Sequence, residues 1–204
     1  RCSALSSITL PAGLTSIGEQ AFTSCTSLAS VTLPLPDGLS IGDGAFFDCP
    51  LDDEAKAAVQ AINFWAVRPP IDAQGHATVP EGLTTIPSSA FSDCSVLVSV
   101  TFPAGLVSIG EYAFSGCSSL AHVTLPATLV SIDDQAFYCC SALTSAAFPA
   151  GLTTIGYSAF EGCSALASVT VPTTAEIGDE AFDPATTVLR LPPASMRAKA
   201  RAAE

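Results

Sequence analysis

The stretch LVSIGEYAFSGC at residues 106–117 returns along the chain with only small changes. Closely similar versions occupy residues 14–25, 129–140 and 152–163. The cysteine that closes the unit recurs mostly at a spacing of 23 residues, at positions 2, 25, 49, 94, 117, 140 and 163. Self-similarity at a fixed period is the signature of a repeat architecture, in which every unit adopts the same local structure.

Each part of the unit predicts a local conformation. In LASVTLP (28–34), small hydroxyl residues alternate with apolar ones, so Ser30 and Thr32 are expected on the outer side of a short strand. Pro34 ends the strand because it cannot donate to the next ladder bond. After a tight turn, L-T-S-I predicts a second extended segment. Gly18 and its equivalents then permit a bend into G-x-x-A-F-x-x-C, for which we predict a single helical or 3₁₀ turn.

The repeat also explains how the chain forms a core. A single unit cannot bury its Leu, Ile and Phe side chains, whereas stacked units place each row of identical side chains on the row below. Adjacent coils then lie about 4.8 Å apart, the spacing of paired strands. The sequence is 49% hydrophobic and 13% charged, which favours such a core over disorder.

The unit L-x-x-V-x-L-P, followed by L-x-x-I-G-x-x-A-F-x-x-C, resembles the BspA-like, or treponemal-type, leucine-rich repeat. The resemblance covers residues 1–49 and 75–191. It implies a right-handed leucine-rich-repeat solenoid with a parallel β-sheet on the concave face, and with short extended segments and single 3₁₀ or helical turns on the other side. It also implies a binding or adhesion role, commonly at the cell surface or outside the cell.

Residues 50–74 interrupt the repeat. The insert begins PLDDEAKAAVQAINFWAVRPPID, in which Asp52 or Asp53 can cap a helix with an acidic first turn. We therefore predict a single solenoid over residues 1–191 with one helical insertion, followed by a helical C-terminal cap or tail at residues 192–204.

Two interpretations of the insert remain open. It is either a decayed repeat packed along the flank of the solenoid, or a functional protrusion, since insertions in repeat arrays map to one face and often bind. In the second case Phe64, Trp65 and Arg68 are the candidate anchors, because aromatic residues and Arg are enriched at the centres of interfaces.

The charge of the chain excludes some partners. The formal net charge is −12, and an acidic body repels phosphate groups, so we expect neither nucleic acid nor an anionic membrane as a partner. Apolar runs are too short to cross a bilayer, so no membrane insertion is expected.

The column of cysteines predicts buried free thiols. A disulfide between adjacent coils is the alternative, and a zinc site is disfavoured because parallel thiols do not form a tetrahedral cluster. Cys139, beside Cys140, is the thiol expected to reach solvent.

Acidic residues recur two positions after the isoleucine of the unit, at Glu19, Asp43, Glu111, Asp134 and Asp179. One interpretation is structural, because carboxylates satisfy unpaired N–H groups in the first turn of a helix. The other is a calcium-binding edge, because calcium prefers oxygen ligands.

The outward positions of the first strand form a hydroxyl-rich face. The candidate partner-binding residues on it are Ser30, Thr32, His76, Thr78, Ser99, Thr101, His122 and Thr124. The face is either a solvated sheet or a broad docking surface for a protein or a glycan. An ice-binding grid is a minor alternative, which the curvature of leucine-rich sheets disfavours.

The sequence predicts no catalytic site and no cofactor. The two histidines, His76 and His122, lie in the same outward column two coils apart, roughly 10 Å from each other, so they form no nucleophile–base pair. The favoured function is a non-enzymatic interaction or adhesion module that binds a macromolecule through the concave sheet or the 51–74 insert. The alternatives are a structural subunit or spacer of a larger assembly and a calcium-dependent adhesin.

Overall fold

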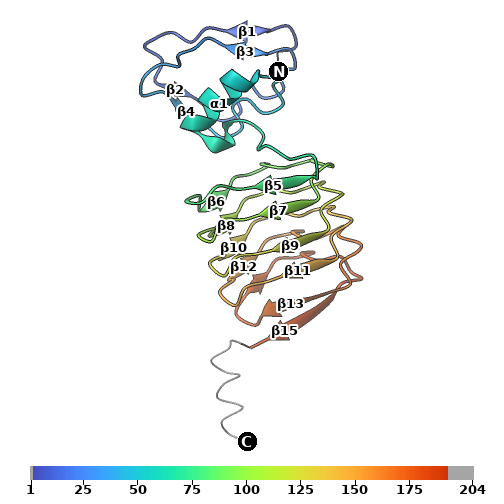
Figure 1. The fold of residues 1–204 in the computed structure, drawn as a ribbon. Coiled ribbons are helices and arrows are strands. Elements are labelled where there is room, and N and C mark those ends of the chain that lie inside the picture. The colour runs from blue at the N-terminus through green and yellow to red at the C-terminus, as the bar shows by residue number, and fades with distance from the viewer. Residues whose placement is uncertain (1, 193–204) are drawn as a thin grey trace, which may run out of the picture. The chain divides into compact units, whose positions relative to one another are not determined.

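The computed structural model describes residues 2–192 and divides the chain into two compact units, residues 1–69 and 70–204. Both units consist of stacked coils, most of which contribute two short parallel strands (Figure 1). This arrangement confirms the predicted repeat solenoid. The prediction that residues 1–191 form one continuous solenoid is not tested by the structure, and each unit is described separately below.

Unit 1 contains two pairs of strands and the inserted helix. The first strands of its coils, β1 (Ser7–Ile8) and β3 (Ser30–Val31), pair in parallel with Ser7 opposite Ser30. The second strands, β2 (Ser16–Ile17) and β4 (Ser40–Ile41), pair with Ser16 opposite Ser40. The insert forms α1 (Asp53–Ile62) and the 3₁₀ turn η1 (Phe64–Ala66).

Unit 2 repeats the same coil along two rows of strands. The second strands form one five-stranded parallel sheet, ordered β6 (Thr85–Ile86), β8 (Ser108–Ile109), β10 (Ser131–Ile132), β12 (Thr154–Ile155) and β14 (Glu176–Ile177). The first strands pair two by two as β5 (His76–Thr78) with β7 (Ser99–Thr101), β9 (His122–Thr124) with β11 (Ser145–Ala147), and β13 (Ser168–Pro172) with β15 (Thr187–Leu191). The 23-residue period therefore brings equivalent side chains into register, as Ser99 beside His76 illustrates.

The core is a file of stacked phenylalanines with aliphatic side chains around it. Phe91, Phe114 and Phe137 are fully buried, and their rings stack with centroids 5.0 Å apart in both steps. Similar stacks join Phe22 to Phe46 in unit 1 and Phe160 to Phe182 in unit 2, at 5.1 and 5.4 Å. Because neighbouring coils present the same ring at the same height, each coil needs the same residue at this position.

The turn before each cysteine differs in detail from the predicted helical or 3₁₀ turn. Gln20 and Ser24 adopt left-handed backbone conformations, with φ of 54° and 59°. Such conformations cost a residue other than glycine roughly 1–2 kcal/mol. In return, the N–H groups of Gln20 and Phe22 donate to Asp43 and Ala45 of the next coil, at 3.0 and 2.7 Å. The turn thus forms a hydrogen-bonded ladder between coils.

The insert keeps this ladder although it replaces a strand with a helix. Asp52 caps α1 by accepting the N–H of Ala55 at 2.8 Å, as predicted from its position. Beyond the helix, the carbonyl of Ala66 accepts the N–H of Phe46 at 2.7 Å, the bond that the carbonyl of Ala45 makes with Phe22 one coil earlier. The insert therefore has the hydrogen bonds of a modified coil, which supports its interpretation as a decayed repeat.

The predicted helical cap or tail at residues 192–204 falls almost entirely outside the described residues.

Candidate functional site

The exposed face of β5, β7 and β9 brings most of the predicted strand-face residues together. His76 lies between two hydroxyls of the next coil, with Nδ1 2.8 Å from Ser99 Oγ and Nε2 3.1 Å from Thr101 Oγ1. With His122 and Thr124, these side chains line a shallow hollow of about 380 Å³. The hollow can offer hydroxyl and imidazole groups, both donors and acceptors, to a ligand.

The other predicted strand-face residues lie outside this hollow. Thr78 is exposed on β5 but does not line it. Ser30 and Thr32 belong to unit 1, where Thr32 Oγ1 lies 3.0 Å from Thr9 Oγ1. They continue the same hydroxyl pattern on another part of the chain.

The aromatic and basic residues of the insert serve the structure of unit 1. Trp65 is only 5% exposed, and its carbonyl accepts the N–H of Gly44 at 2.8 Å. Phe64 packs edge-on against it with ring centroids 5.0 Å apart. Arg68 donates to Asp48 at 3.2 Å and lies 5.6 Å over the ring of Phe47. Trp65 therefore offers a partner little surface.

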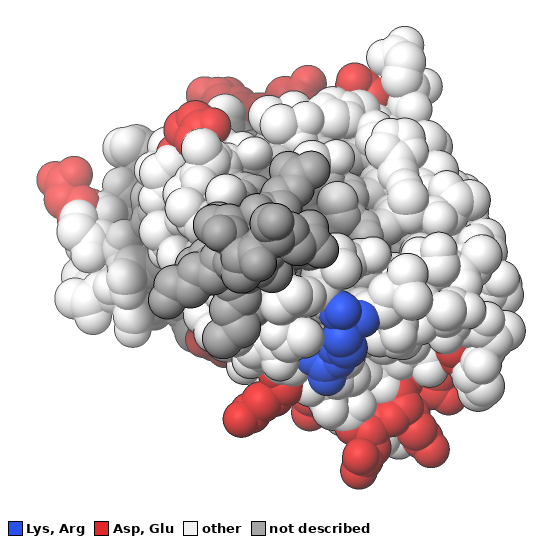
Figure 2. All heavy atoms as spheres, turned by 90° about the horizontal axis from the view of Figure 1, so that it is seen from below, with Lys and Arg blue, Asp and Glu red and all other residues white. Residues whose placement is uncertain are grey.

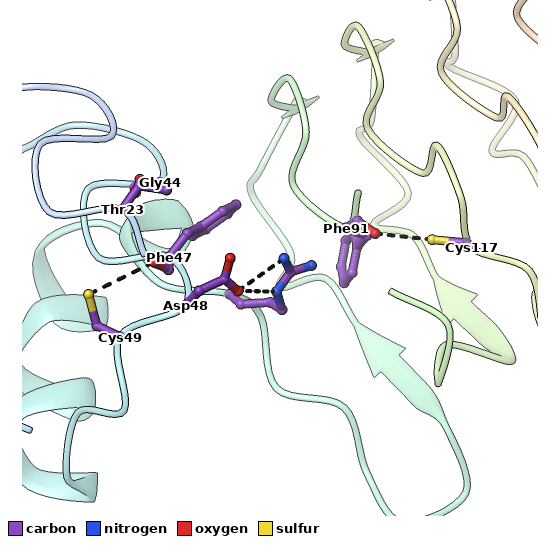
Figure 3. Close-up of polar contacts among 8 residues, drawn as sticks. Thr23, Gly44, Phe47, Asp48, Cys49, Phe91 and Cys117 are labelled. Carbon is purple, nitrogen blue, oxygen red and sulfur yellow. Dashed lines mark hydrogen bonds and ion pairs between the residues drawn. The ribbon is translucent and has the colours of Figure 1, made fainter. Parts of the chain in front are cut away.

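The cysteine column is a ladder of thiol hydrogen bonds. Cys117 Sγ donates to the carbonyl of Phe91, 26 residues earlier, at 3.1 Å, and Cys140 and Cys163 make the same bond to Phe114 and Phe137. Figure 3 shows the Cys117 thiol pointing at the Phe91 carbonyl. A thiol suits this position because it is apolar enough for the core and still donates weakly.

The structure places most thiols of the column in the core, as predicted, but Cys2 is exposed and Cys49 is half-buried. All eight cysteines are free, and Cys25, Cys94, Cys117, Cys140 and Cys163 are buried. Cys139 is exposed, as predicted, and so is Cys2. The hydrogen bond with the Cys163 thiol, together with burial, raises the pKa of Cys140, so this thiol stays protonated and keeps its role as a donor.

The acidic column contacts neighbouring backbone and side-chain donors. Asp134 Oδ1 accepts the N–H of Tyr157 in the next coil at 2.7 Å, and Asp43 Oδ1 accepts from Asn63 Nδ2 at 2.8 Å. Burial, followed by the neighbouring Asp134, raises the pKa of Asp133. Within residues 2–192, no three His, Cys, Asp or Glu side chains are arranged to hold a metal ion.

Charge is unevenly distributed over unit 2. Residues 70–192 contain eleven Asp and Glu residues against Arg190, a net charge of −10. Seen from below, the surface of the described residues shows groups of Asp and Glu and one patch of Lys or Arg (Figure 2). None of these acids occupies an outward position of the first-strand row, where Ser, Thr and His predominate. The row is thus a neutral strip on an acidic unit.

A groove in unit 1 was missed by the sequence reasoning. It has a volume of about 690 Å³ and lies between the segment 33–39 and α1. Its walls are mostly apolar, with Leu33, Leu35 and Pro36 facing Ala58 and Ile62. The signal was the spacing of Cys25 and Cys49, 24 residues instead of 23, because the segment 33–39 is longer than its counterpart at residues 10–14 and lies in the unit that precedes the insert.

The stacked parallel coils and the internal file of phenylalanines that recurs from coil to coil define a leucine-rich solenoid. The model of the BspA-type leucine-rich repeat region matches six copies at residues 1–60 and 74–188, so the chain belongs to this family. This confirms the resemblance identified from the sequence. Leucine-rich repeats of this family suggest protein-interaction or surface modules and are generally non-enzymatic.

Solved structures show the same fold. A leucine-rich repeat protein from Bacteroides ovatus is 22% identical, with a TM-score of 0.59, and the match covers 91% of this chain and 66% of that one. The pneumococcal vaccine antigen PcpA is 19% identical, with a TM-score of 0.60, over 92% of this chain and 57% of the antigen. The chain therefore spans less than two thirds of either protein. A comparison with curated proteins gives no match.

Among the described residues, no helix combines the length and the apolar character that a membrane span requires.

Proposed function

We propose that the chain is a non-enzymatic protein-interaction module that docks a macromolecule on the exposed first-strand face of unit 2. The docking surface is centred on the hollow lined by His76, Ser99, Thr101, His122 and Thr124. A family of interaction and surface repeats supports the general role, and the neutral strip supports the location.

The observation that carries the proposal is the absence of carboxylates from this strip. A sheet face that only meets water gains solubility from charged side chains, and the rest of unit 2 is rich in them. The centres of interfaces, by contrast, are depleted of charge, because a charge that loses its water without a partner is costly. Small hydroxyl side chains also lose little conformational entropy when a partner covers them.

The test places a charged, longer side chain on the strip. Thr101→Lys and Thr124→Lys should each abolish capture of the partner that the wild-type protein retains from its native source, identified by mass spectrometry. Thr84→Lys is the matched control, because Thr84 is also an exposed threonine but lies beside β6 in the other strand row. Equal recovery of the partner by all four proteins would contradict the proposed surface.

A further inference from the structure

The groove in unit 1 is built from two departures from the repeat. The segment 33–39 has the sequence LPLPDGL, two residues longer than its counterpart LPAGL at residues 10–14, and α1 stands where the next coil would place its first strand. Together they border an open groove of about 690 Å³, within the size range of small-molecule pockets, about 300–1,000 Å³.

The helix has more apolar surface than its own packing uses. Ala55 and Val59 face the core of unit 1 and are 1% and 0% exposed. Glu54, Ala58 and Ile62 follow at a spacing of four residues and form a second stripe, which lines the groove. Ile62 is 39% exposed, so it still presents apolar surface to the groove.

The opposite wall of the groove provides apolar contact, and its rim provides negative charge. Leu33, Leu35 and Pro36 are only half-buried, so they offer apolar contact to an occupant. The charged residues that line the groove, Asp37 and Glu54, are both acidic and exposed. Residues 2–69 contain seven acids against Lys56 and Arg68, a net charge of −5, so the field around the groove favours cations.

From these features we infer that the groove binds a short peptide segment of a partner protein in which a large aliphatic or aromatic side chain is flanked by Lys or Arg. The apolar side chain fills the space between α1 and the segment 33–39, and the basic residues pair with Asp37 and Glu54. This mode corresponds to a peptide anchored in a groove by apolar contacts and oriented by charge at the rim. The inference rests on the proposed role as an interaction module but uses a second site.

A random peptide library provides a test that does not require the native partner. Twelve-residue peptides displayed on phage are selected on the wild-type protein and counter-selected on the Leu35→Ser/Ile62→Ser double variant. The enriched peptides should combine a large apolar residue with Lys or Arg within one helical turn. Circular dichroism and thermal melting verify that each variant is folded.

The affinities of one enriched peptide for single variants then separate the contribution of apolar contact from the contribution of charge. Ile62→Ser should weaken binding roughly tenfold, the loss expected for about 1.4 kcal/mol of apolar contact. Glu54→Lys, which leaves the walls intact, should weaken binding about threefold to tenfold, and more at low salt. Asp53→Lys is the matched charge control in the same helical turn, and Val98→Ser matches the exposure of Ile62; both should change the affinity less than about twofold.

Three outcomes would overturn the inference. Enriched peptides that are acidic, or that bind the groove variants as tightly as the wild type, would contradict the assigned chemistry. A selection that yields no peptide sensitive to Leu35 and Ile62 would contradict a peptide site. A concentration-dependent dimer that Ile62→Ser dissolves would assign the groove to a second copy. None of these results affects the Thr101 and Thr124 test, which concerns other residues.

Discussion

The thiol ladder predicts that two neighbouring cysteines differ sharply in their contribution to stability. Cys140 is fully buried and donates to Phe114 at 3.1 Å, whereas Cys139 is exposed. Cys140→Ala removes buried surface worth about 0.8 kcal/mol, comparable to one methylene. A cavity on the order of 25 Å³ adds about 0.6 kcal/mol.

The lost hydrogen bond is the third contribution to the free-energy cost of Cys140→Ala. The Phe114 carbonyl still accepts the N–H of Cys117 at 3.1 Å, so the loss of the thiol donor costs only about 0.5 kcal/mol. Cys140→Ala should therefore lower the free energy of unfolding by about 2 kcal/mol. Cys139→Ala should change it by less than about 0.5 kcal/mol, as is usual for exposed positions.

The aromatic residues allow the assay to follow each unit separately. All three tyrosines (112, 138 and 157) lie in unit 2, and the one tryptophan, Trp65, lies in unit 1. Urea unfolding followed by tyrosine emission should show the loss in Cys140→Ala, with tryptophan emission as an internal reference. Coincident transitions in the wild type would support the predicted single solenoid over residues 1–191. Equal stability of the two cysteine variants would refute the role given to the ladder.

Two further predictions follow from the same coils. Because the pKa of Cys140 is raised in the folded state, the unfolded chain releases this proton first, and stability should decline as the pH rises through the ordinary thiol range, about 8.5. Urea midpoints measured across this pH range should fall less steeply in Cys140→Ala than in the wild type. Identical slopes would contradict the raised pKa of Cys140. Gly156→Ala should lower the free energy of unfolding by about 1–3 kcal/mol, since the added Cβ would lie 2.5 Å from the backbone nitrogen of Asp134. Gly151→Ala, whose added Cβ would have its nearest neighbour at 3.7 Å, should be neutral or slightly stabilising. Equal thermal midpoints of the two variants would show that the coils do not approach as closely as described.

Much of the fold follows from the repeat pattern alone. The alternation in SVT, the proline after it and the recurrent Ala-Phe pair predict the strands, their ends and the stacked core, because every level of the pattern favours the same structure. The start of α1 is also readable from Asp52 and its acidic first turn.

Features that depend on contacts between coils could not be predicted from the pattern. The left-handed conformations of Gln20 and Tyr112 carry no local signal, since neither residue is glycine, and they are stabilised by bonds to the next coil. The burial of Trp65 likewise depends on how the insert returns to the repeat, and composition alone left open whether this side chain is a core residue or an exposed anchor. The groove requires knowledge of where α1 lies relative to residues 33–39.

The backbone hydrogen bonds between the turns of neighbouring coils run in one direction through the described residues, and this has an evolutionary consequence. Along the turns the earlier coil donates to the later one, as Phe91 does to Ala113, whereas along the strands the bonds run both ways, as Gly110 donates to Ile86 and Val79 donates to Thr101. A new segment can therefore be accepted into the array if it presents carbonyls to the turn of the coil before it, whatever its own conformation. The Trp65 and Ala66 carbonyls meet this condition at the end of a helix, so an array of this kind can acquire new surface elements without rebuilding its core.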